Sequence, residues 1–263
     1  MRSGVQERKS SLDVQIAGRT DVGRVRRSNE DAFGIVEPLA LAVICDGMGG
    51  AAGGEIASKV ALEAFLDVTR REVESSKSED SDRTRRALCR AAAAANRAVR
   101  SRAEYDTRFR GMGTTLVAAR LDGNELMILN VGDSRAYIVR GGAARQMTAD
   151  HSYVAEQMRM GLMTRREAEG SALRSAITRA IGIDDDVQPD FFTETIAAGD
   201  SLLLCSDGLV HHLRDEEIGE IAGDPTSTPA AICDRLVAEV NARGGTDNVT
   251  CVVMRFGALR ARG

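Results

Sequence analysis

Apolar residues recur along the chain with two different spacings, and each spacing predicts one kind of element. In the range Glu55–Val73 the apolar side chains fall three to four residues apart, for example at Ile56, Val60 and Ala64. This spacing places them on one face of an α-helix. A second helix is expected over Leu88–Val99, where a run of alanines permits close packing against a neighbouring helix.

Short apolar runs bounded by turn residues predict β-strands through much of the remaining chain. The connections Asp122–Asn124 and Gly132–Ser134 are so short that they can join only antiparallel neighbours. Strands therefore outnumber helices, and the pattern favours antiparallel sheets with helices packed outside, which is an α+β fold. The expected strands are Val14–Ala17, Ala32–Val36, Leu39–Cys45, Thr114–Leu121, Glu125–Val131, Ala136–Val139, Ser201–Cys205 and Val249–Phe256.

The stretch from Asp150 to Asp190 follows neither pattern. It is polar and rich in arginine, and Thr164 with Glu167 forms a capping box that starts a helix within it. We interpret residues 150–190 as a flap inserted into a single domain of residues 14–257. Residues 1–13 and 258–263 are assigned to terminal tails. After the flap, Thr228 is expected to cap one more helix.

Composition narrows the classes of partner. The chain has 263 residues, 35 basic and 39 acidic side chains and a net charge of −4, which argues against nucleic acid as the main partner. Its five cysteines form no CxxC pair, so neither a disulfide framework nor a zinc ribbon is supported. The longest apolar run, Leu39–Cys45, is far too short to span a membrane, and the first residues lack a signal peptide's apolar region. We expect a cytoplasmic monomer with no membrane partner.

Four aspartates stand where apolar runs end or begin: Asp46, Asp133, Asp207 and Asp247. Strand ends can hold carboxylates close together only if a cation neutralises them. Oxygen ligands without a cluster of Cys or His favour magnesium or manganese. The alternative is that each one belongs to an ordinary turn, because Asp-Gly is also a common hairpin signal.

Seven sequence blocks in a fixed order carry a resemblance to a known family. The chain resembles the metal-dependent protein phosphatases, also called protein phosphatase 2C, in their compact bacterial form, and the resemblance spans roughly residues 14–256. The blocks are RRSNED (26–31), VICDGMGGAAGGEIAS (43–58), GMGTT (111–115), NVGDSRAY (130–137), TADHS (148–152), LCSDGL (204–209) and GGTDNVT (244–250).

The resemblance implies a four-layer α-β-β-α sandwich of two antiparallel sheets flanked by helices, with a two-metal site at one end. Mn²⁺ or Mg²⁺ would be the cofactor. Asp46 would bridge both ions, the Gly47 carbonyl would bind one of them, and Asp207 and Asp247 would complete the shell of the first. Asp133 would belong to a third, weaker site.

The same resemblance implies hydrolysis of phosphoserine and phosphothreonine by a water that the two ions activate. Arg26 would hold the substrate phosphate, since a guanidinium can contact two oxygens at once. Glu30 and Asp31 would hold metal-bound waters. The implied partners are phosphorylated proteins, in particular a Ser/Thr kinase or its substrates.

The chain departs from the family pattern in its histidines. Many relatives carry one in place of Met48 or Ala51, where it is proposed as a general acid. The only histidines here, His151, His211 and His212, are interpreted as structural or surface groups. We therefore hypothesise that activity persists but favours substrates with good leaving groups.

Two other functions fit parts of the sequence. Gly47, Gly49 and Ala52 satisfy the GxGxxA pattern of a dinucleotide site, with Asp67 some 20 residues further on. Hairpin connections and the charge of Asp46 argue against it. The missing histidine would also suit a metal-binding module that recognises phosphoproteins with weak or no hydrolysis.

Overall fold

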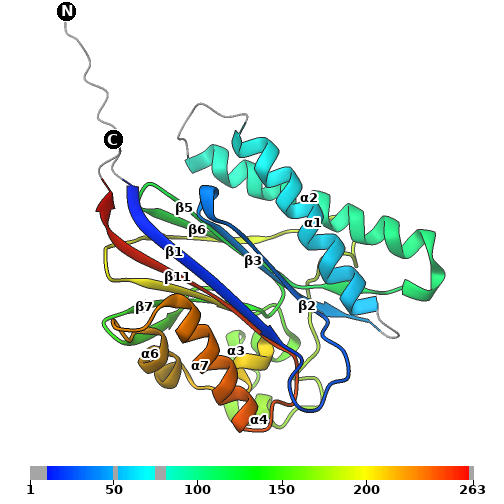
Figure 1. The fold of residues 1–263 in the computed structure, drawn as a ribbon. Coiled ribbons are helices and arrows are strands. Elements are labelled where there is room, and N and C mark those ends of the chain that lie inside the picture. Colours follow the sequence, from blue (N-terminus) through cyan, green and yellow to red (C-terminus); the bar gives the residue numbers. More distant parts are fainter. Residues whose placement is uncertain (1–10, 50–52, 75–80, 261–263) are drawn as a thin grey trace, which may run out of the picture.

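Two antiparallel β-sheets form the middle layers of the molecule (Figure 1). The computed structural model describes residues 11–49, 53–74 and 81–260. The first sheet has the order β1 (Ser11–Asp21), β11 (Val249–Arg260), β10 (Ser201–Cys205), β7 (Arg135–Arg140) and β8 (Ala143–Gln146). The second has the order β2 (Asp31–Val36), β3 (Leu41–Met48), β5 (Leu116–Asp122), β6 (Glu125–Val131) and β9 (Asp190–Thr195), and β4 (Gly113–Thr114) pairs with β3.

Helices cover the outer faces of both sheets. Two long helices, α1 (Gly53–Glu74) and α2 (Ser81–Tyr105), pack on the second sheet, and α6 (Asp215–Ala222) with α7 (Pro229–Ala242) packs on the first. Three short helices complete the described chain: α3 (Tyr153–Arg159), α4 (Arg165–Glu169) and α5 (Asp207–Val210). The 3-10 turns are Glu37–Leu39 and Thr107–Phe109. None of the helices in the described ranges is long and apolar enough to cross a bilayer.

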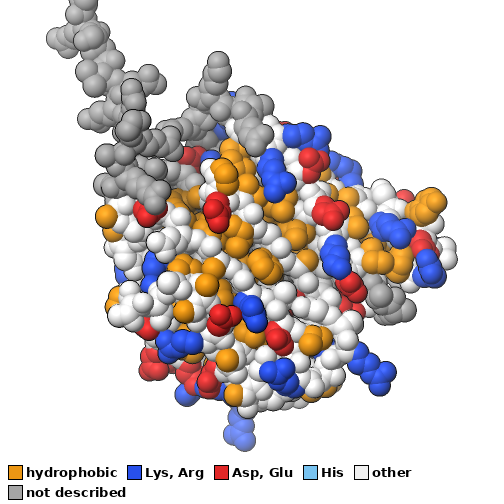
Figure 2. Space-filling model, in the orientation of Figure 1, with side chains coloured by type: hydrophobic (Ala, Val, Ile, Leu, Met, Phe, Trp, Pro, Cys, Tyr) orange, Lys and Arg blue, Asp and Glu red, His pale blue; other side chains and the backbone are white. Residues whose placement is uncertain are grey.

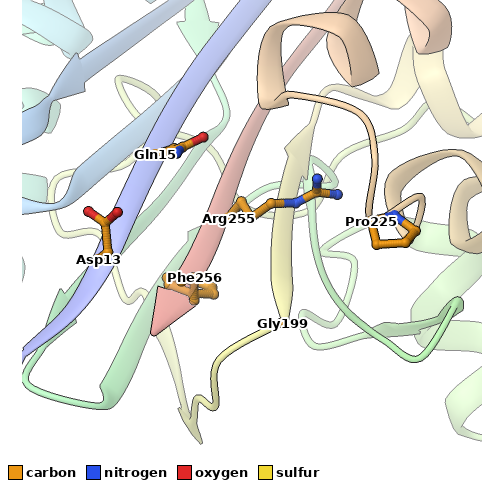
Figure 3. A pocket seen from close by; sticks show the side chains of 8 residues that line it. Asp13, Gln15, Gly199, Pro225, Arg255 and Phe256 are labelled. Atoms are coloured by element: carbon orange, nitrogen blue, oxygen red, sulfur yellow. The ribbon is translucent and has the colours of Figure 1, made fainter. Parts of the chain in front are cut away.

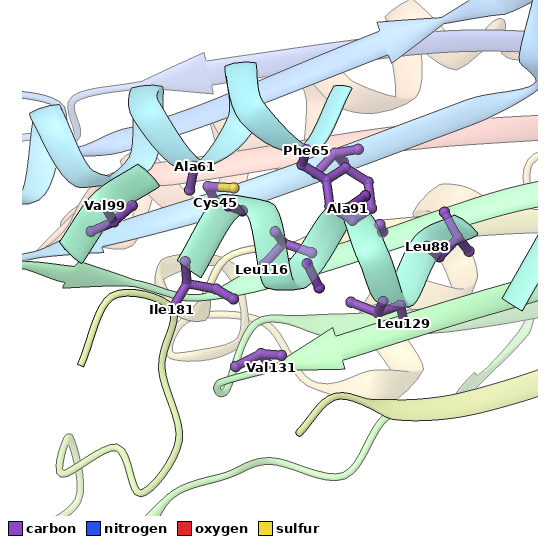
Figure 4. Packing of buried hydrophobic residues seen from close by; sticks show 14 of the residues in the cluster. Cys45, Ala61, Phe65, Leu88, Ala91, Val99, Leu116, Leu129, Val131 and Ile181 are labelled. Carbon is purple, nitrogen blue, oxygen red and sulfur yellow. The ribbon is translucent and has the colours of Figure 1, made fainter. Parts of the chain in front are cut away.

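Three buried layers of apolar side chains hold these four layers together. One lies between the two sheets, and the others lie beneath each pair of helices. Under α1 and α2 the small side chains of Ala61, Ala91 and Ala95 let the helices approach the sheet, and Phe65 fills the remaining space (Figure 4). Burying a side chain of this size contributes about 1.5 to 3 kcal/mol.

The predicted fold class is confirmed, with differences in detail. All strand pairs among the described residues are antiparallel, which removes the parallel crossovers that a dinucleotide site requires. The strands β8 and β9 were not expected because their exposed edges carry polar residues. The helix α2 begins at Ser81, earlier than the expected Leu88, because its first residues are charged and polar and lack the apolar spacing of a helix.

The tails divide between described and undescribed residues. Residues 11–13 and 258–260, assigned above to the tails, extend the paired strands β1 and β11. The rest of both tails lies outside the described residues, as do Gly50, Ala51 and Ala52 of the glycine-rich segment.

Several strand ends meet at one edge of the sandwich. Cys205 at the end of β10 pairs with Cys251 near the start of β11, and Asp31 at the start of β2 pairs with Asp46 near the end of β3. The ends of β1 and β10 and the starts of β2 and β11 therefore lie together. The four predicted aspartates all fall at this edge.

Candidate metal centre

Five carboxylates face one another at this edge, and we call them the carboxylate cluster: Asp31, Asp46, Asp133, Asp207 and Asp247. Burial raises the pKa of Asp46 well above its ordinary value, and the charges of the other four members raise it further. A group of acids held this closely repels itself when ionised. The four predicted aspartates therefore influence one another at this edge, and their role as metal ligands stays a prediction.

The backbone of Asp46 is fixed on both sides. Its N–H donates to the Thr115 hydroxyl at 3.0 Å, and its carbonyl accepts from the Thr114 hydroxyl and from the Thr115 N–H, both at 2.8 Å. The Thr115 hydroxyl also contacts that of Ser134 at 2.7 Å, beside Asp133. Buried hydroxyls thus connect the backbone of Asp46 to Ser134, the residue after Asp133.

Gly47 lies where three backbone segments come close together. Its N–H donates to the Glu30 carbonyl at 3.1 Å. A Cβ at this position would lie 2.1 Å from the Gly54 carbonyl oxygen and 2.6 Å from that of Glu30, which no side chain tolerates. The Glu30 carboxylate lies against Gly54 at the start of α1, where a Cβ would be 2.4 Å from Glu30 Oε2. Only glycines permit this junction.

Asp31 connects the two sheets behind Asp46. Its Oδ2 accepts from the Ser206 hydroxyl at 2.9 Å and from the Thr250 hydroxyl at 2.6 Å, although Thr250 belongs to β11 of the other sheet and Ser206 directly follows β10 of that sheet. Its Oδ1 is buried with no hydrogen-bond partner. Burial raises the pKa of Asp31 to about 6, against the lowering effect of the two hydroxyls. A buried carboxylate oxygen without a donor is costly unless a cation or water satisfies it.

Asp207 and Asp133 complete the cluster on the far side of Asp46. Asp207 is the first residue of α5, and its pKa is raised by burial and by the charge of Asp247. The pKa of Asp133 is raised to about 7 by burial and then by Asp207. His211 Nδ1 lies 3.8 Å from Asp207 Oδ2, so one histidine stands at the rim of the cluster.

The other two histidines are engaged elsewhere. His151 is 1% exposed, accepts from the Gly132 N–H at Nδ1 and contacts Asp190 at Nε2. The His151 side chain therefore connects the loop before Asp133 to Asp190 at the start of β9. His212 Nε2 contacts the Thr246 hydroxyl at 2.9 Å. Both arrangements agree with a structural role.

Arg26 reaches the cluster from the loop between β1 and β2. Its Nη2 donates to Asp247 Oδ2 at 2.8 Å, while Asp247 Oδ1 accepts from the Asn248 N–H at 2.8 Å. The guanidinium remains half exposed, so its other donors face outward. The hydrogen bond from Arg26 to Asp247 is also the main cause of the raised pKa of Arg26.

The donor set fits a hard divalent cation. The cluster offers only carboxylate oxygens as ligand atoms, which hard cations prefer. Burial and mutual repulsion raise the pKa values of four of its five aspartates. One oxygen of Asp31 also lacks a hydrogen-bond partner. Among the described residues no group of three or more Asp, Glu, His or Cys side chains is arranged as a ready-made metal site. Arg26 also donates a hydrogen bond to Asp247. A cation would therefore compete with this ion pair.

Sequence reasoning missed the polar side chains that hold the carboxylates in place. Ser206 directly precedes Asp207 in the sequence, and Asn248 directly follows Asp247, so adjacency to a ligand candidate was the available signal for these two. Thr114 and Thr115 belong to the GMGTT block but are far in sequence from every predicted aspartate, so only the folded structure shows their role.

A hollow of about 270 Å³ lies at the opposite end of β11 and is separate from the cluster (Figure 3). Arg255 extends from β11 into it, eight residues and roughly 25 Å along the strand from Asp247. The guanidinium donates to the backbone carbonyls of Ala222, Asp224 and Ser227. These bonds close the loop after α6, so Arg255 has a structural explanation.

Charge is mixed on one face of the molecule. Figure 2 shows basic and acidic side chains interspersed over the face that carries α1, β1 and β11. Attraction of an anionic ligand to the cluster would therefore depend on local groups such as Arg26.

Comparison with known proteins agrees with this geometry. Residues 24–243 match the sequence model of the family described as Protein phosphatase 2C. The serine/threonine phosphatase stp of Listeria innocua is 34% identical over 239 residues, which cover 90% of this chain and 93% of that protein. The structure of Stp1 from Staphylococcus aureus superposes with a TM-score of 0.85 at 31% identity, covering 96% of this chain and 99% of that one. The catalytic domain of PstP in complex with two manganese ions gives a TM-score of 0.82 at 34% identity, covering 94% and 100%.

Proposed function

The chain belongs to the protein phosphatase 2C family and is a metal-dependent serine/threonine protein phosphatase, and we propose that its reaction takes place at the carboxylate cluster. The observation that supports this location is the convergence of the carboxylates: Asp31 pairs with Asp46 across β2 and β3, and the charges of the other four members raise the pKa of Asp46. Such a group is stable in ionised form only with cations nearby. The alternative of a recognition module without hydrolysis is not favoured, because the relatives are named phosphatases.

We assign the cation ligands to residues of the cluster. Asp46 and the Gly47 carbonyl would contact the ions, Asp207 and Asp247 would complete one shell, and Asp133 would hold a further ion. Manganese occupies the related PstP structure, and magnesium suits the same oxygen donors. When bound, such cations activate a water as nucleophile and neutralise charge on the phosphoryl group.

The remaining residues act on the substrate and on the cluster itself. Arg26 would contact the phosphate through the guanidinium donors that face away from Asp247, and its planar fork suits two oxygens at once. Glu30 and Asp31 would accept hydrogen bonds from water around the ions. The free Oδ1 of Asp31 supports this role, since no protein donor reaches it.

An isosteric substitution tests the location of the site. Asp207→Asn keeps the shape of the side chain and removes one negative charge from the cluster. We expect manganese-dependent hydrolysis of p-nitrophenyl phosphate to fall by at least about a thousandfold, and Mn²⁺ binding measured by calorimetry to weaken. Asp215→Asn, at the start of α6, serves as the matched control. Full activity in Asp207→Asn would place the chemistry elsewhere.

We further propose that the physiological substrates are a phosphorylated Ser/Thr kinase or that kinase's own targets, and that the enzyme acts as a cytoplasmic monomer. All five cysteines are free, which suits a reducing compartment. Dephosphorylation of an autophosphorylated kinase, cell fractionation and light scattering would each test one part of this proposal.

A further inference from the structure

One buried side chain, that of Asn248, ties together both ends of the loop that carries Arg26. We call residues 22–30, between β1 and β2, the Arg26 loop. Asn248 is 6% exposed. Its Nδ2 donates to the carbonyls of Val22 at 3.0 Å and Ser28 at 2.9 Å, and its Oδ1 accepts from the Glu30 N–H at 2.8 Å. Both amide donors and the amide oxygen are therefore engaged with this loop.

The Arg26 loop needs such a tether because its tip makes few contacts of its own. Residues 24–28 are exposed, and Val25 is 65% exposed although it is apolar. Outside the tether, the Arg24 N–H donates to the Gly245 carbonyl at 2.7 Å, and Asn29 contacts Thr20. Without Asn248 the Glu30 N–H and the two carbonyls would lose these partners, which destabilises this conformation of the loop.

Asn248 directly follows Asp247, a proposed cation ligand, in the sequence. These two residues act on Arg26 in different ways. Asp247 contacts the Arg26 guanidinium directly, so a cation or a phosphate would compete with that bond. Asn248 contacts only backbone atoms of the loop, and these bonds do not depend on what the guanidinium binds. The loop would keep its conformation while Arg26 changes partner.

We propose that Asn248 is a positioning residue that fixes the Arg26 loop so that Arg26 meets the substrate phosphate at the cluster. This inference rests on the proposed function, because it assigns phosphate binding to Arg26. It differs from a role in orienting Asp247. Within the described chain, the hydrogen bond between these two neighbours comes from the Asn248 backbone N–H, which alanine would retain.

Substitution by alanine separates these roles. In Asn248→Ala we expect KM for a phosphothreonine peptide to rise roughly tenfold with little change in kcat, because a displaced guanidinium weakens phosphate binding. Mn²⁺ affinity, measured by calorimetry, should stay unchanged. Weakened Mn²⁺ binding with a normal KM would overturn the proposal and show that Asn248 acts through Asp247.

Asn96 supplies a closely matched control. It is 2% exposed, its Nδ2 donates to the carbonyls of Asp184 and Asp185, and its Oδ1 accepts from the Gly182 N–H. Asn96→Ala therefore removes the same kinds of bond at a distance from the Arg26 loop. We expect a similar loss of thermal stability with an unchanged KM. An equal rise of KM in both variants would show a general structural effect and overturn the proposal.

A double-mutant cycle tests whether Asn248 acts through Arg26. In an Arg26→Ala background, Asn248→Ala should raise KM by less than about twofold further, since the group that it positions is gone. If the two substitutions together raised KM by the product of their separate effects, the proposal would be contradicted. Should Asn248→Ala fail to fold, Asn248→Ser, which is too short to reach both carbonyls, carries the same cycle.

Hydrogen exchange gives a readout that does not need activity. Amides of residues 22–30 should exchange faster in Asn248→Ala than in the unaltered protein, both without added cation, while residues 182–185 should not change. Unaltered exchange in the loop would overturn the tether. If the unaltered protein showed no phosphatase activity, the proposed function would fail, and the exchange experiment would still decide whether Asn248 orders the loop.

Discussion

At the scale of single residues, the site depends on what each charged group is able to contact. Arg26 is held by one hydrogen bond to Asp247 and leaves the rest of its fork open. The four aspartates could be predicted because each stands at the end or start of an apolar run. The role of Asn248 could not, since its partners are backbone atoms whose positions depend on the folded loop.

The fork of Arg26 leads to a prediction on substrate affinity. Arg26→Lys keeps the charge but replaces the planar fork with a single ammonium group, which cannot contact two phosphate oxygens in the same geometry. We expect KM for a phosphothreonine peptide to rise roughly tenfold and kcat to change less. Arg27→Lys, at the next exposed position, should leave KM within about twofold. Steady-state kinetics on both variants would check this, and an unchanged KM in Arg26→Lys would refute it.

The positions of the histidines lead to a prediction on leaving groups. The sequence has no histidine at position 48 or 51, and His151 and His212 are engaged away from the cluster. A poor alkoxide leaving group needs a proton, whereas a nitrophenolate does not. We expect kcat for p-nitrophenyl phosphate to exceed that for a phosphothreonine peptide by at least about tenfold. Equal kcat values would contradict this hypothesis, and a loss in His211→Gln confined to the peptide would identify His211 as the proton donor.

At the scale of elements, local pattern and long-range pairing contribute differently. The helices α1 and α7 follow from apolar spacing and caps, and Thr228 caps α7 as expected by accepting from the Ala231 N–H. The sheet order does not follow from local pattern, because β1 pairs with β11 from the other end of the chain. Only the packed core decides between such pairings, and a single sequence does not show it.

The junction of β3 with α1 gives a prediction on stability. Gly47→Ala would place a methyl group 2.1 Å from the Gly54 carbonyl oxygen, so the strand or the helix start must shift. We expect a loss of about 1 to 3 kcal/mol or more in the free energy of unfolding, together with loss of activity. Gly170→Ala is the control, since the nearest atom to its Cβ would be at 3.7 Å. Urea denaturation would compare the two, and equal stability would show that this close approach is relieved without cost.

At the scale of the whole molecule, the two sheets are joined at the cluster as well as through the core. Asp31 of the second sheet accepts from Ser206 and Thr250 of the first, so the carboxylates lie at the seam between the layers. Repulsion within the cluster therefore acts against the stacking of the sheets. A cation that relieves the repulsion should stabilise the entire fold.

This coupling leads to a prediction on how stability depends on pH. Burial raises the pKa of Asp31 to about 6 and that of Asp133 to about 7, above the ordinary value of 3.8, and raises that of Asp46 as well. A folded-state pKa above the unfolded one gives stability that is complete at low pH and is lost as pH rises through the folded value. Without cations, the protein should therefore unfold at a higher temperature at pH 6.5 than at pH 8.5.

Calorimetry with EDTA and with saturating Mn²⁺ over pH 6.5 to 8.5 would check this. The lower limit matters because burial lowers the pKa of His151 below its ordinary value of 6.5. Its contribution has the opposite sign, since it is complete above the unfolded pKa and is lost as pH falls below that value through the folded pKa. Manganese should raise the melting temperature most at pH 8.5, where the carboxylates are ionised.

Asp133→Asn removes one repelling charge, so it should stabilise the cation-free protein at pH 8.5 and reduce the pH dependence. A cation-free protein that is more stable at pH 8.5 than at pH 6.5 would show that the carboxylates do not repel one another as the geometry requires.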